Sequence, residues 1–414
     1  MRVGIDLGTS YSSISVLNKE SKPEPIHVST GISVFGNNYS LPSAVYVDQG
    51  KIIVGQAAIQ SRMRKPENFK SEFKRDLGQD VPYNLGGLQL LPQDLYKELF
   101  IHLKECAEKY TNEVVDSACI THPANYNNRK KELIISAAKA AGILKVDLLD
   151  EPTAAALFYH QDKTINENCT LLVYDFGGGT FDVSLIQYEN GKFKSLTQPL
   201  GLENCGGIDI DRRIFNDILS FIPKDLFETI KKNPLNLQRF KVRLNEISVK
   251  AKHHLSYAEN FNEDIEIGFD FVNYSLSRLH LNNMICDLVN ETISCTMRIV
   301  ENAGIGISNV DKFLLVGGTS RIPYIRERLE TFNLQNLQSN INPELAVSLG
   351  AITSLSNTIT TQSANANGRT INSNQQHNIT TNSIDEKEAK KCKFTKHNAP
   401  DWLINQLNNL INKN

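Results

Sequence analysis

Residues 173–186 read VYDFGGGTFDVSLI. An apolar strand pattern reaches Asp175, three consecutive glycines follow at Gly177, Gly178 and Gly179, and the alternation of apolar and polar residues then resumes at once. This pattern predicts two antiparallel strands joined by a tight glycine turn. Because the turn joins a strand to a strand, it differs from Walker and dinucleotide-binding loops, both of which open a helix.

The same arrangement occurs a second time near the start of the chain. Residues 3–16 read VGIDLGTSYSSISV and residues 172–185 read LVYDFGGGTFDVSL. In both segments a strand ends at an aspartate and a glycine follows two residues later; the aspartates, Asp6 and Asp175, are 169 residues apart (175 minus 6). A repeat at this distance indicates two similar lobes and excludes a solenoid, whose repeats are much shorter.

The glycines and aspartates suggest a site for a phosphate group. A turn whose backbone amides all point at one anion is expected to need positive φ angles, which glycine adopts at little cost. Two carboxylates near a triphosphate would repel it unless a divalent cation lay between them, and Mg²⁺ accepts such carboxylates and phosphates while it keeps several waters. The alternative for either segment alone is an ordinary tight turn.

Composition limits the class of protein. The chain has 414 residues and a formal net charge of −2, so we expect more than one core and no nucleic-acid partner. Its seven cysteines form no C-x-x-C pair, which favours free thiols in a reducing compartment. The opening MRVGIDLG is not a signal peptide, and no apolar stretch is long enough to span a membrane. We expect a cytoplasmic protein.

The chain before residue 356 mixes strand and helix patterns, which indicates an α/β fold. Strands are predicted at 2–8, 12–17, 44–47, 51–55, 118–122, 146–150, 170–177, 181–188 and 312–318, and helices at 92–111, 128–143 and 283–305. Residues 356–396 are polar and are predicted to form a disordered linker. Apolar residues at helical spacing predict a short amphipathic helix at 397–414.

Several segments, in this order, resemble the nucleotide-binding domain of the 70-kilodalton heat-shock chaperones, the DnaK-type family. They are GIDLGTSYSSISV, EFKRDLG, DEPTAAALFYH, VYDFGGGTFDVSLI, LLVGGTSRIPYI and INPELAVSLGAI. The resemblance covers residues 1 to about 355 and implies an actin-like ATPase fold. It also implies two lobes, about 1–165 and 166–355, with related βββαβα-type cores and a nucleotide cleft between them.

The resemblance assigns roles to individual residues. Lys74 would position the attacking water and the γ-phosphate, and Thr180 and Asp182 would face that phosphate. Asp6 and Asp175 would hold Mg²⁺, Asp175 partly through water, and Glu151 would act through a metal-bound water. The residues that would contact ATP or ADP are Gly8, Thr9, Ser10, Tyr11, Gly177, Gly178, Gly179, Thr180, Gly206, Gly207, Lys252, His253, Ser256, Gly317, Gly318, Thr319, Arg321 and Glu344.

The sequence also departs from the family pattern. Val249 replaces an acidic residue that accepts hydrogen bonds from ribose, and Lys131 replaces an arginine that senses lobe closure. Asp147 and Asp150 replace the arginine and asparagine that meet the J-domain co-chaperone and the interdomain linker, which places that partnership in question. After residue 355 neither the family's linker nor its peptide-binding sandwich or helical lid is recognisable.

Three functions are therefore considered. The first is a slow Mg-dependent ATP hydrolase of the chaperone type, working by opening and closing of its lobes, with a J-domain co-chaperone or exchange factor as partner. The second is a nucleotide-binding regulator or co-chaperone mimic without client binding. The third is a sugar kinase or a filament-forming actin relative, which shares the fold. The segments EPTAAA and FKRDLG favour the chaperone branch.

Overall fold

The computed structural model describes residues 1–28, 38–161, 168–331, 337–338 and 343–354. The predicted linker at 356–396 and the predicted helix at 397–414 lie outside these residues. We call the described residues 1–161 the first lobe and the described residues 168–331 the second lobe.

The first lobe is built on a sheet that contains the strand of Asp6. The strand order is β11-β10-β1-β2-β3, and β4 also pairs with β2. Strand β1 runs antiparallel to β2 and parallel to β10, so that Ile5 lies between Ile14 and Ile120. The strands are β1 (Arg2–Leu7), β2 (Tyr11–Leu17), β3 (Pro23–Pro25), β4 (Leu41–Pro42), β10 (Ser117–His122) and β11 (Lys145–Asp150).

The second lobe repeats this topology around the strand of Asp175. The order is β14-β13-β12-β18-β19, with β15 also pairing with β13. Again the central strand is antiparallel to its hairpin partner and parallel to the strand on its other side. The strands are β12 (Cys169–Phe176), β13 (Thr180–Glu189), β14 (Lys192–Ser195), β15 (Leu200–Glu203), β18 (Lys312–Val316) and β19 (Leu337–Gln338). The two predicted hairpins and the similarity of the two halves are confirmed.

Local sequence signals explain the long helices. Helix α2 (Pro92–Thr111) begins with proline, its first turn is capped by the Asp94 carboxylate, and it ends at Asn112 in the left-handed conformation. Asn127 caps α3 (Asn128–Ala140), and Ser277 caps α8 (Arg278–Asn302). All three helices were predicted from their periodicity and are confirmed.

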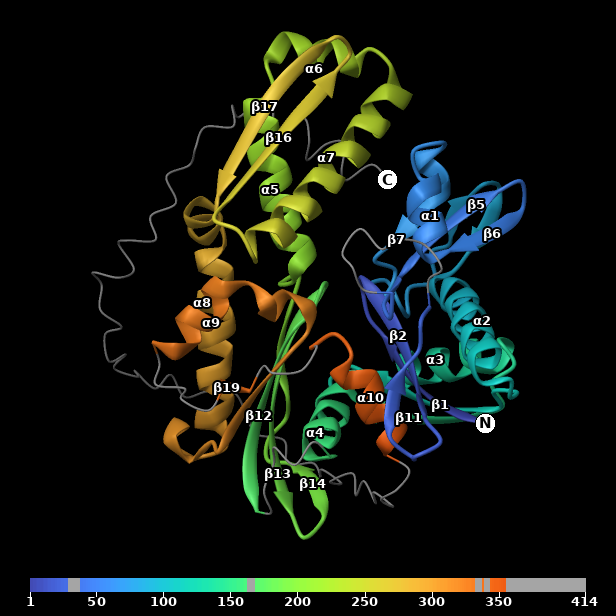
Figure 1. Cartoon of the computed structure of the whole chain (residues 1–414), viewed down its shortest axis with the longest axis vertical. Helices are drawn as coiled ribbons and strands as arrows, with labels where there is room; N and C mark the ends of the chain where they lie inside the picture. Colours follow the sequence, from blue (N-terminus) through green and yellow to red (C-terminus); the bar gives the residue numbers. More distant parts are fainter. Residues whose placement is uncertain (29–37, 162–167, 332–336, 339–342, 355–414) are drawn as a thin grey trace, which may run out of the picture. The chain divides into compact units, whose positions relative to one another are not determined.

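Helix α10 (Ala346–Thr353) follows the second lobe in sequence but packs on the first. It contacts β1, β2, β10 and the helix α4 (Glu151–Gln161), beside which it lies in Figure 1. Every residue of α10 is buried, so this helix needs neighbours on all sides. The predicted second lobe, 166–355, therefore does not include α10, because its apolar surface is covered by the first sheet and α4.

The remaining elements extend the two lobes. In the first lobe they are α1 (Gly55–Ser61), η1 (Pro66–Asn68), β5 (Ala44–Asp48), β6 (Lys51–Val54), β7 (Phe69–Ser71), β8 (Tyr83–Leu85) and β9 (Leu88–Leu90). In the second they are α5 (Gly207–Phe221), α6 (Lys224–Lys231), α7 (Pro234–Leu255), β16 (Asn260–Ile267), β17 (Asp270–Ser277), η2 (Ile307–Asn309), η3 (Gly318–Arg321) and α9 (Pro323–Glu330). The hairpin of β16 and β17 was not predicted, because many of its residues are polar. In the structure these polar residues are mostly on the exposed side of each strand.

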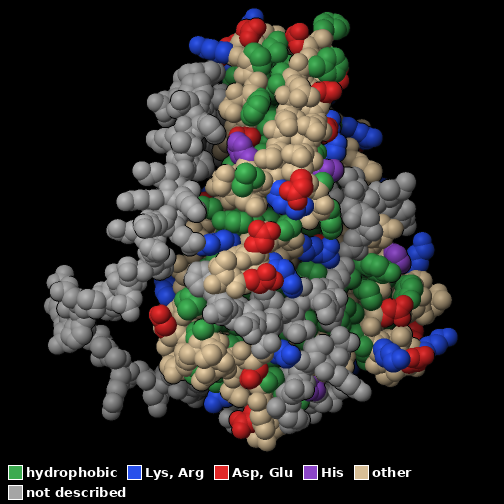
Figure 2. Space-filling view, turned by 60° about the vertical axis from the view of Figure 1, so that its left-hand side comes forward, with side chains coloured by type: hydrophobic (Ala, Val, Ile, Leu, Met, Phe, Trp, Pro, Cys, Tyr) green, Lys and Arg blue, Asp and Glu red, His purple; other side chains and the backbone are tan. Residues whose placement is uncertain are grey.

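The surface and the cysteines bear on two further expectations. On the face seen in Figure 2, basic and acidic side chains are interspersed, in agreement with the balanced composition. No helix among the described residues is both long and apolar enough to cross a membrane. Free thiols are present at Cys106, Cys119, Cys169, Cys205 and Cys295. Cys286 is disulfide-bonded, so the expectation of free thiols does not hold there.

The contact between α4 and α10 generates a test of the fold. A Cβ atom on Gly350 would lie 1.7 Å from the Ala154 carbonyl oxygen, so Gly350→Ala must push the two helices apart. We expect a loss of about 1–3 kcal/mol or more in the free energy of unfolding, measured by chemical denaturation. In the control Gly306→Ala the nearest atom would be 3.4 Å away, and stability should not fall. Equal stability of the two variants would contradict this packing.

Candidate functional site

A pocket lies between the two glycine turns and collects nearly all of the predicted site residues. The turns contribute Gly8, Thr9, Ser10, Tyr11, Gly177, Gly178, Gly179 and Thr180. The other predicted residues on its wall are Asp6, Lys74, Glu151, Asp175, Gly207, Lys252, His253, Ser256, Gly317, Gly318, Thr319 and Glu344. Gly206, Arg321 and Asp182 are not on the wall: Gly206 packs behind Gly178, Arg321 forms an ion pair of 3.8 Å with Glu344, and Asp182 lines a neighbouring pocket.

The two turns touch each other across the pocket. A Cβ on Gly178 would lie 2.1 Å from the Ser10 hydroxyl oxygen, and one on Gly179 would lie 2.5 Å from the Thr9 hydroxyl oxygen. None of the three glycines has the positive φ that the sequence analysis expected. The expected positive φ angles are therefore wrong. Glycine is required here because the opposite turn comes too close for a side chain.

Hydrogen bonds hold the carbonyl groups of the second turn away from the pocket. The Gly177 carbonyl accepts from the Gly207 amide at 3.0 Å and from the Thr319 hydroxyl at 2.7 Å. The Gly178 carbonyl accepts from the Ile208 amide at 2.9 Å. Because a trans peptide places its N–H opposite its C=O, the amides of Gly178 and Gly179 point to the other side. Such amides form a binding concavity for an anion.

The first turn is fixed by a single neighbour. The hydroxyl of Ser43 donates to the Gly8 carbonyl at 2.7 Å, and the Ser43 amide donates to the Ser10 carbonyl at 2.8 Å. A Cβ on Gly8 would lie 2.0 Å from the Tyr11 carbonyl oxygen, so only glycine permits this turn. Both turns therefore have their carbonyl oxygens bound elsewhere, which lowers the repulsion of a phosphate group.

Lys74 and the carboxylates of the pocket form one electrostatic group. The Lys74 ammonium donates to Glu151 at 2.8 Å, and both side chains are largely buried. Burial acts to lower the pKa of Lys74, but Glu151, Tyr126 and Asp6 together raise it above its usual value. The ammonium therefore remains charged, and Glu151 fixes its position.

The aspartates lack comparable compensation. Burial raises the pKa of Asp6 to about 7, with Glu151 adding to the rise, although the Thr121 hydroxyl donates to Asp6 at 2.9 Å. Burial and the carboxylates of Glu151, Asp182 and Asp6 raise the pKa of Asp175 well above its usual range. Burial likewise raises the pKa of Asp182 to about 6. The site thus gathers more carboxyl groups than Lys74 could neutralise if all of them were ionised.

This gathering of carboxyl groups fits a bound cation, which would allow them to ionise. Carboxylate oxygens are the ligands that Mg²⁺ prefers, and a divalent ion would remove the repulsion that raises these pKa values. Among the described residues, no three His, Cys, Asp or Glu side chains lie close enough to hold a metal ion directly. The residues therefore fit Mg²⁺ that keeps waters and phosphate oxygens as most of its ligands.

The opposite end of the pocket has the predicted strand-to-helix turn. Gly317 has φ +80° and donates its amide to the Pro343 carbonyl at 3.3 Å. The Thr319 hydroxyl donates to the Gly177 carbonyl of the second glycine turn. Burial, with Lys252 and Arg321 nearby, lowers the pKa of His253 to about 3, so its ring is neutral.

Residues at the departures from the family pattern have partners inside this chain. Asp147 forms an ion pair of 2.6 Å with Arg2, and its side chain is 65% exposed. Asp150 accepts from the Thr153 amide at 2.9 Å, at the start of α4. Lys252, which matches the family pattern, donates to Asp211 at 2.7 Å and to the Gly207 carbonyl at 3.0 Å. The two aspartates that replace family residues therefore have structural roles in this protein.

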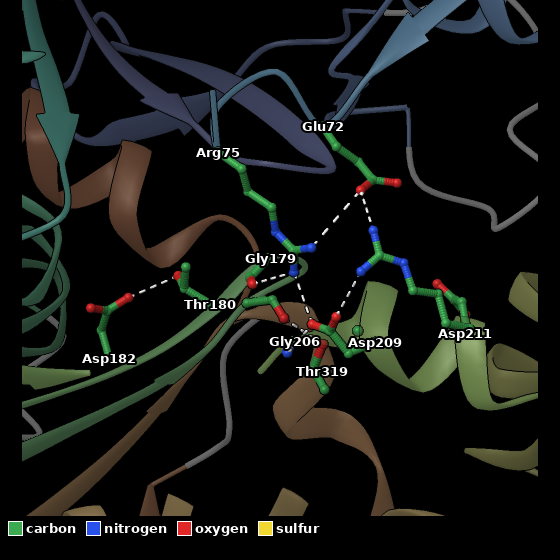
Figure 3. A network of polar contacts seen from close by, with 12 residues as sticks. Glu72, Arg75, Gly179, Thr180, Asp182, Gly206, Asp209, Asp211 and Thr319 are labelled. Atoms are coloured by element: carbon green, nitrogen blue, oxygen red, sulfur yellow. Dashed lines mark hydrogen bonds and ion pairs between the residues drawn. The ribbon is translucent and has the colours of Figure 1, made fainter. Parts of the chain in front are cut away.

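Two charged residues beside the pocket, Arg75 and Asp209, were not predicted from the sequence. Arg75 extends from the first lobe and donates to the Gly179 carbonyl and, at 2.8 Å, to Asp209 (Figure 3). Asp209 also accepts from the Gly206 amide at 3.0 Å. The available signal was the position of Arg75 directly after Lys74 in EFKRDLG, but nothing in the sequence indicated which residue it would contact.

Comparison with known families agrees with this geometry. The family model described as Hsp70 protein matches residues 2–356. The match includes both hairpins, the segment with Lys74, helix α4 and the strand-to-helix turn at Gly317.

The contact between the turns can be tested directly. Gly178→Ala should force the turns apart and weaken binding of Mg-ADP by about tenfold or more, because one lost phosphate contact has that order of effect. Calorimetry would measure this. The double variant Ser10→Gly/Gly178→Ala removes the clashing atoms and should recover part of the affinity. Binding by Gly178→Ala at the parent's affinity would contradict the proposed arrangement.

The raised pKa of Asp6 predicts a pH-dependent stability. In the unfolded chain Asp6 ionises near pH 3.8, whereas in the folded protein its pKa is about 7. The folded state therefore loses stability as pH rises between these values, by up to roughly 4 kcal/mol. Asp6→Asn keeps the acceptor for Thr121 but removes this loss.

The measurement is the thermal unfolding of the metal-free protein at pH 5 and pH 8. Asp6→Asn should gain stability over the parent as pH rises, since only the parent must ionise the buried carboxyl group at position 6. Asp76→Asn, at a half-buried ion pair with Lys70, serves as a control whose difference from the parent should stay nearly constant between pH 5 and pH 8. A difference between Asp6→Asn and the parent that does not change with pH would refute the assignment.

Proposed function

Because the chain belongs to the Hsp70 family, whose members are ATP-binding chaperones with ATPase activity, we propose that it binds Mg-ATP between its two glycine turns. We propose in addition that it hydrolyses ATP slowly while its lobes open and close. The observation that carries this proposal is the contact of Gly178 and Gly179 with Ser10 and Thr9. Turns from two lobes that meet at one point can bind one polyphosphate from both sides.

The residues at this point would act mainly by position and charge. Phosphoryl transfer to water requires little covalent chemistry from the protein and depends on charge stabilisation and alignment. The Lys74 ammonium, held by Glu151 at 2.8 Å, would orient the attacking water and the γ-phosphate. The Thr180 hydroxyl, which donates to Asp182 at 2.8 Å, would lie on the same side. Mg²⁺, when bound, would offset the charge of Asp6, Asp175 and the phosphates.

The adenosine would occupy the end near Gly317 and Gly318. His253, as a neutral ring, can stack on the base, although less strongly than the arginine that the family has there. Val249 cannot accept a hydrogen bond from a ribose hydroxyl as an acidic residue does. The proposed nucleotide affinity is therefore lower than that of a relative with both residues.

A second candidate is a nucleotide-binding regulator that competes for co-chaperones or exchange factors without useful turnover. It is favoured by Asp147, which brings a negative charge to a position where the chaperones have arginine and which pairs with Arg2 at 2.6 Å. Reversing the sign of a charge at such an interface weakens association with an ordinary J-domain. The third function, a sugar kinase or filament-forming protein, is disfavoured by the Hsp70 match.

Single-turnover hydrolysis of bound ATP separates the two candidates. Lys74→Ala and Glu151→Ala should each lower the rate constant by roughly tenfold to a thousandfold, since each removes an electrostatic element that acts in the transition state. Lys97→Ala, which removes a surface lysine paired with Glu98, should match the parent. Binding of nucleotide without measurable hydrolysis would support the regulator, and equal rates in all variants would refute the roles of Lys74 and Glu151.

A further inference from the structure

The three carbonyl groups of the second glycine turn are held by different parts of the molecule. The carbonyls of Gly177 and Gly178 accept hydrogen bonds from Gly207 and Ile208, at the start of α5 in the same lobe. The Gly179 carbonyl instead accepts from Nη2 of Arg75, a residue of the first lobe (Figure 3). One of the three peptides of this turn therefore depends on the opposite lobe for its orientation.

That peptide is the one that leads to Thr180. When Arg75 holds the Gly179 carbonyl, the amide of Thr180 must point to the opposite side of the same rigid plane. If the carbonyl were released, glycine at this position could rotate and turn its oxygen toward the pocket. A carbonyl oxygen there would repel the phosphate whose charge the turn has to stabilise.

We propose that Arg75 is a positioning residue for phosphoryl transfer, which completes the second glycine turn only when the two lobes are closed. The inference rests on the proposed function and adds to it a link between lobe closure and the geometry of the phosphate site. ATP, with its third phosphate beside Lys74 and Thr180, depends on this peptide more than ADP does.

The surroundings of Arg75 restrict where its guanidinium can lie. Arg75 forms its ion pair of 2.8 Å with Asp209, and the two side chains are only 16% and 12% exposed. Asp209 is itself held by the Gly206 amide at 3.0 Å. The largely buried Asp209 carboxylate fixes the position of the guanidinium. Nη2 of Arg75 carries two hydrogens, so it can donate one to Asp209 and the other to the Gly179 carbonyl.

Neighbouring ion pairs provide controls that leave the turn untouched. Arg212 pairs with Asp209 at 3.2 Å and with Glu72 at 3.5 Å, but its side chain is 58% exposed and makes no bond to the turn. Arg62 forms an ion pair with Glu246 of the other lobe at 2.7 Å. Neither residue lies on the pocket wall. Arg212→Ala thus tests the charge network, and Arg62→Ala tests contact between the lobes.

The experiment compares Arg75→Ala with these two controls in the whole chain. Single-turnover cleavage of bound ATP should fall by about tenfold or more in Arg75→Ala, because a misdirected donor in an oxyanion site has effects of this order. By calorimetry its affinity for Mg-ATP should fall several-fold more than its affinity for Mg-ADP. Both controls should stay within about twofold of the parent. Arg75→Lys, which keeps the charge but has a single nitrogen, should lie between Arg75→Ala and the parent, and it replaces Arg75→Ala if that variant does not fold.

Three results would overturn the inference. The first is cleavage and affinity in Arg75→Ala equal to those of the parent. The second is an equal loss of cleavage in Arg62→Ala, which would show that Arg75 only holds the lobes together. The third is an equal loss of cleavage in Arg212→Ala, which would assign the effect to the charge network. If the parent binds ATP but does not cleave it, the proposed hydrolysis fails, and the ratio of ATP to ADP affinity still decides the role of Arg75.

Discussion

The structure depends on the approach of two glycine turns to within contact distance. Gly178 and Gly179 leave no space for a Cβ beside Ser10 and Thr9, so only glycine allows the first and second lobes to approach this closely here. The turns end equivalent strands of two similar sheets, and their carbonyl oxygens are bound away from the shared pocket. Two similar strand-turn-strand units in this way line a single pocket.

The second constraint is charge. Burial and the nearby Glu151 raise the pKa values of Asp6, Asp175 and Asp182, and Lys74 offsets only part of this rise. Concentrating carboxylates in a buried place destabilises the protein unless a ligand offsets it. Functional sites commonly carry such a cost in stability. Here a polyphosphate that brings a metal cation would offset it.

Outside the pocket, the protein departs from the family pattern in ways that its own contacts explain. Asp147 and Asp150 are tied to Arg2 and to the start of α4, so they serve local structure at a surface where the chaperones contact a partner. Arg75, in contrast, directs its charge inward to the turn of the other lobe. The machinery around the nucleotide is thus more complete than the surface through which a J-domain would act.

Local patterns in the sequence determined much of this protein: both hairpins, helices α2, α3 and α8, and the aspartate beside each glycine turn follow from short-range alternation and periodicity. They did not indicate α7, although it is 22 residues long. The resemblance of a few motifs identified nearly every residue on the pocket wall. The tertiary structure alone decided why the glycines are needed, where α10 packs and which carbonyl Arg75 holds. Those features depend on contacts between segments more than a hundred residues apart, and such contacts are set by how two sheets pack together, which no local pattern encodes.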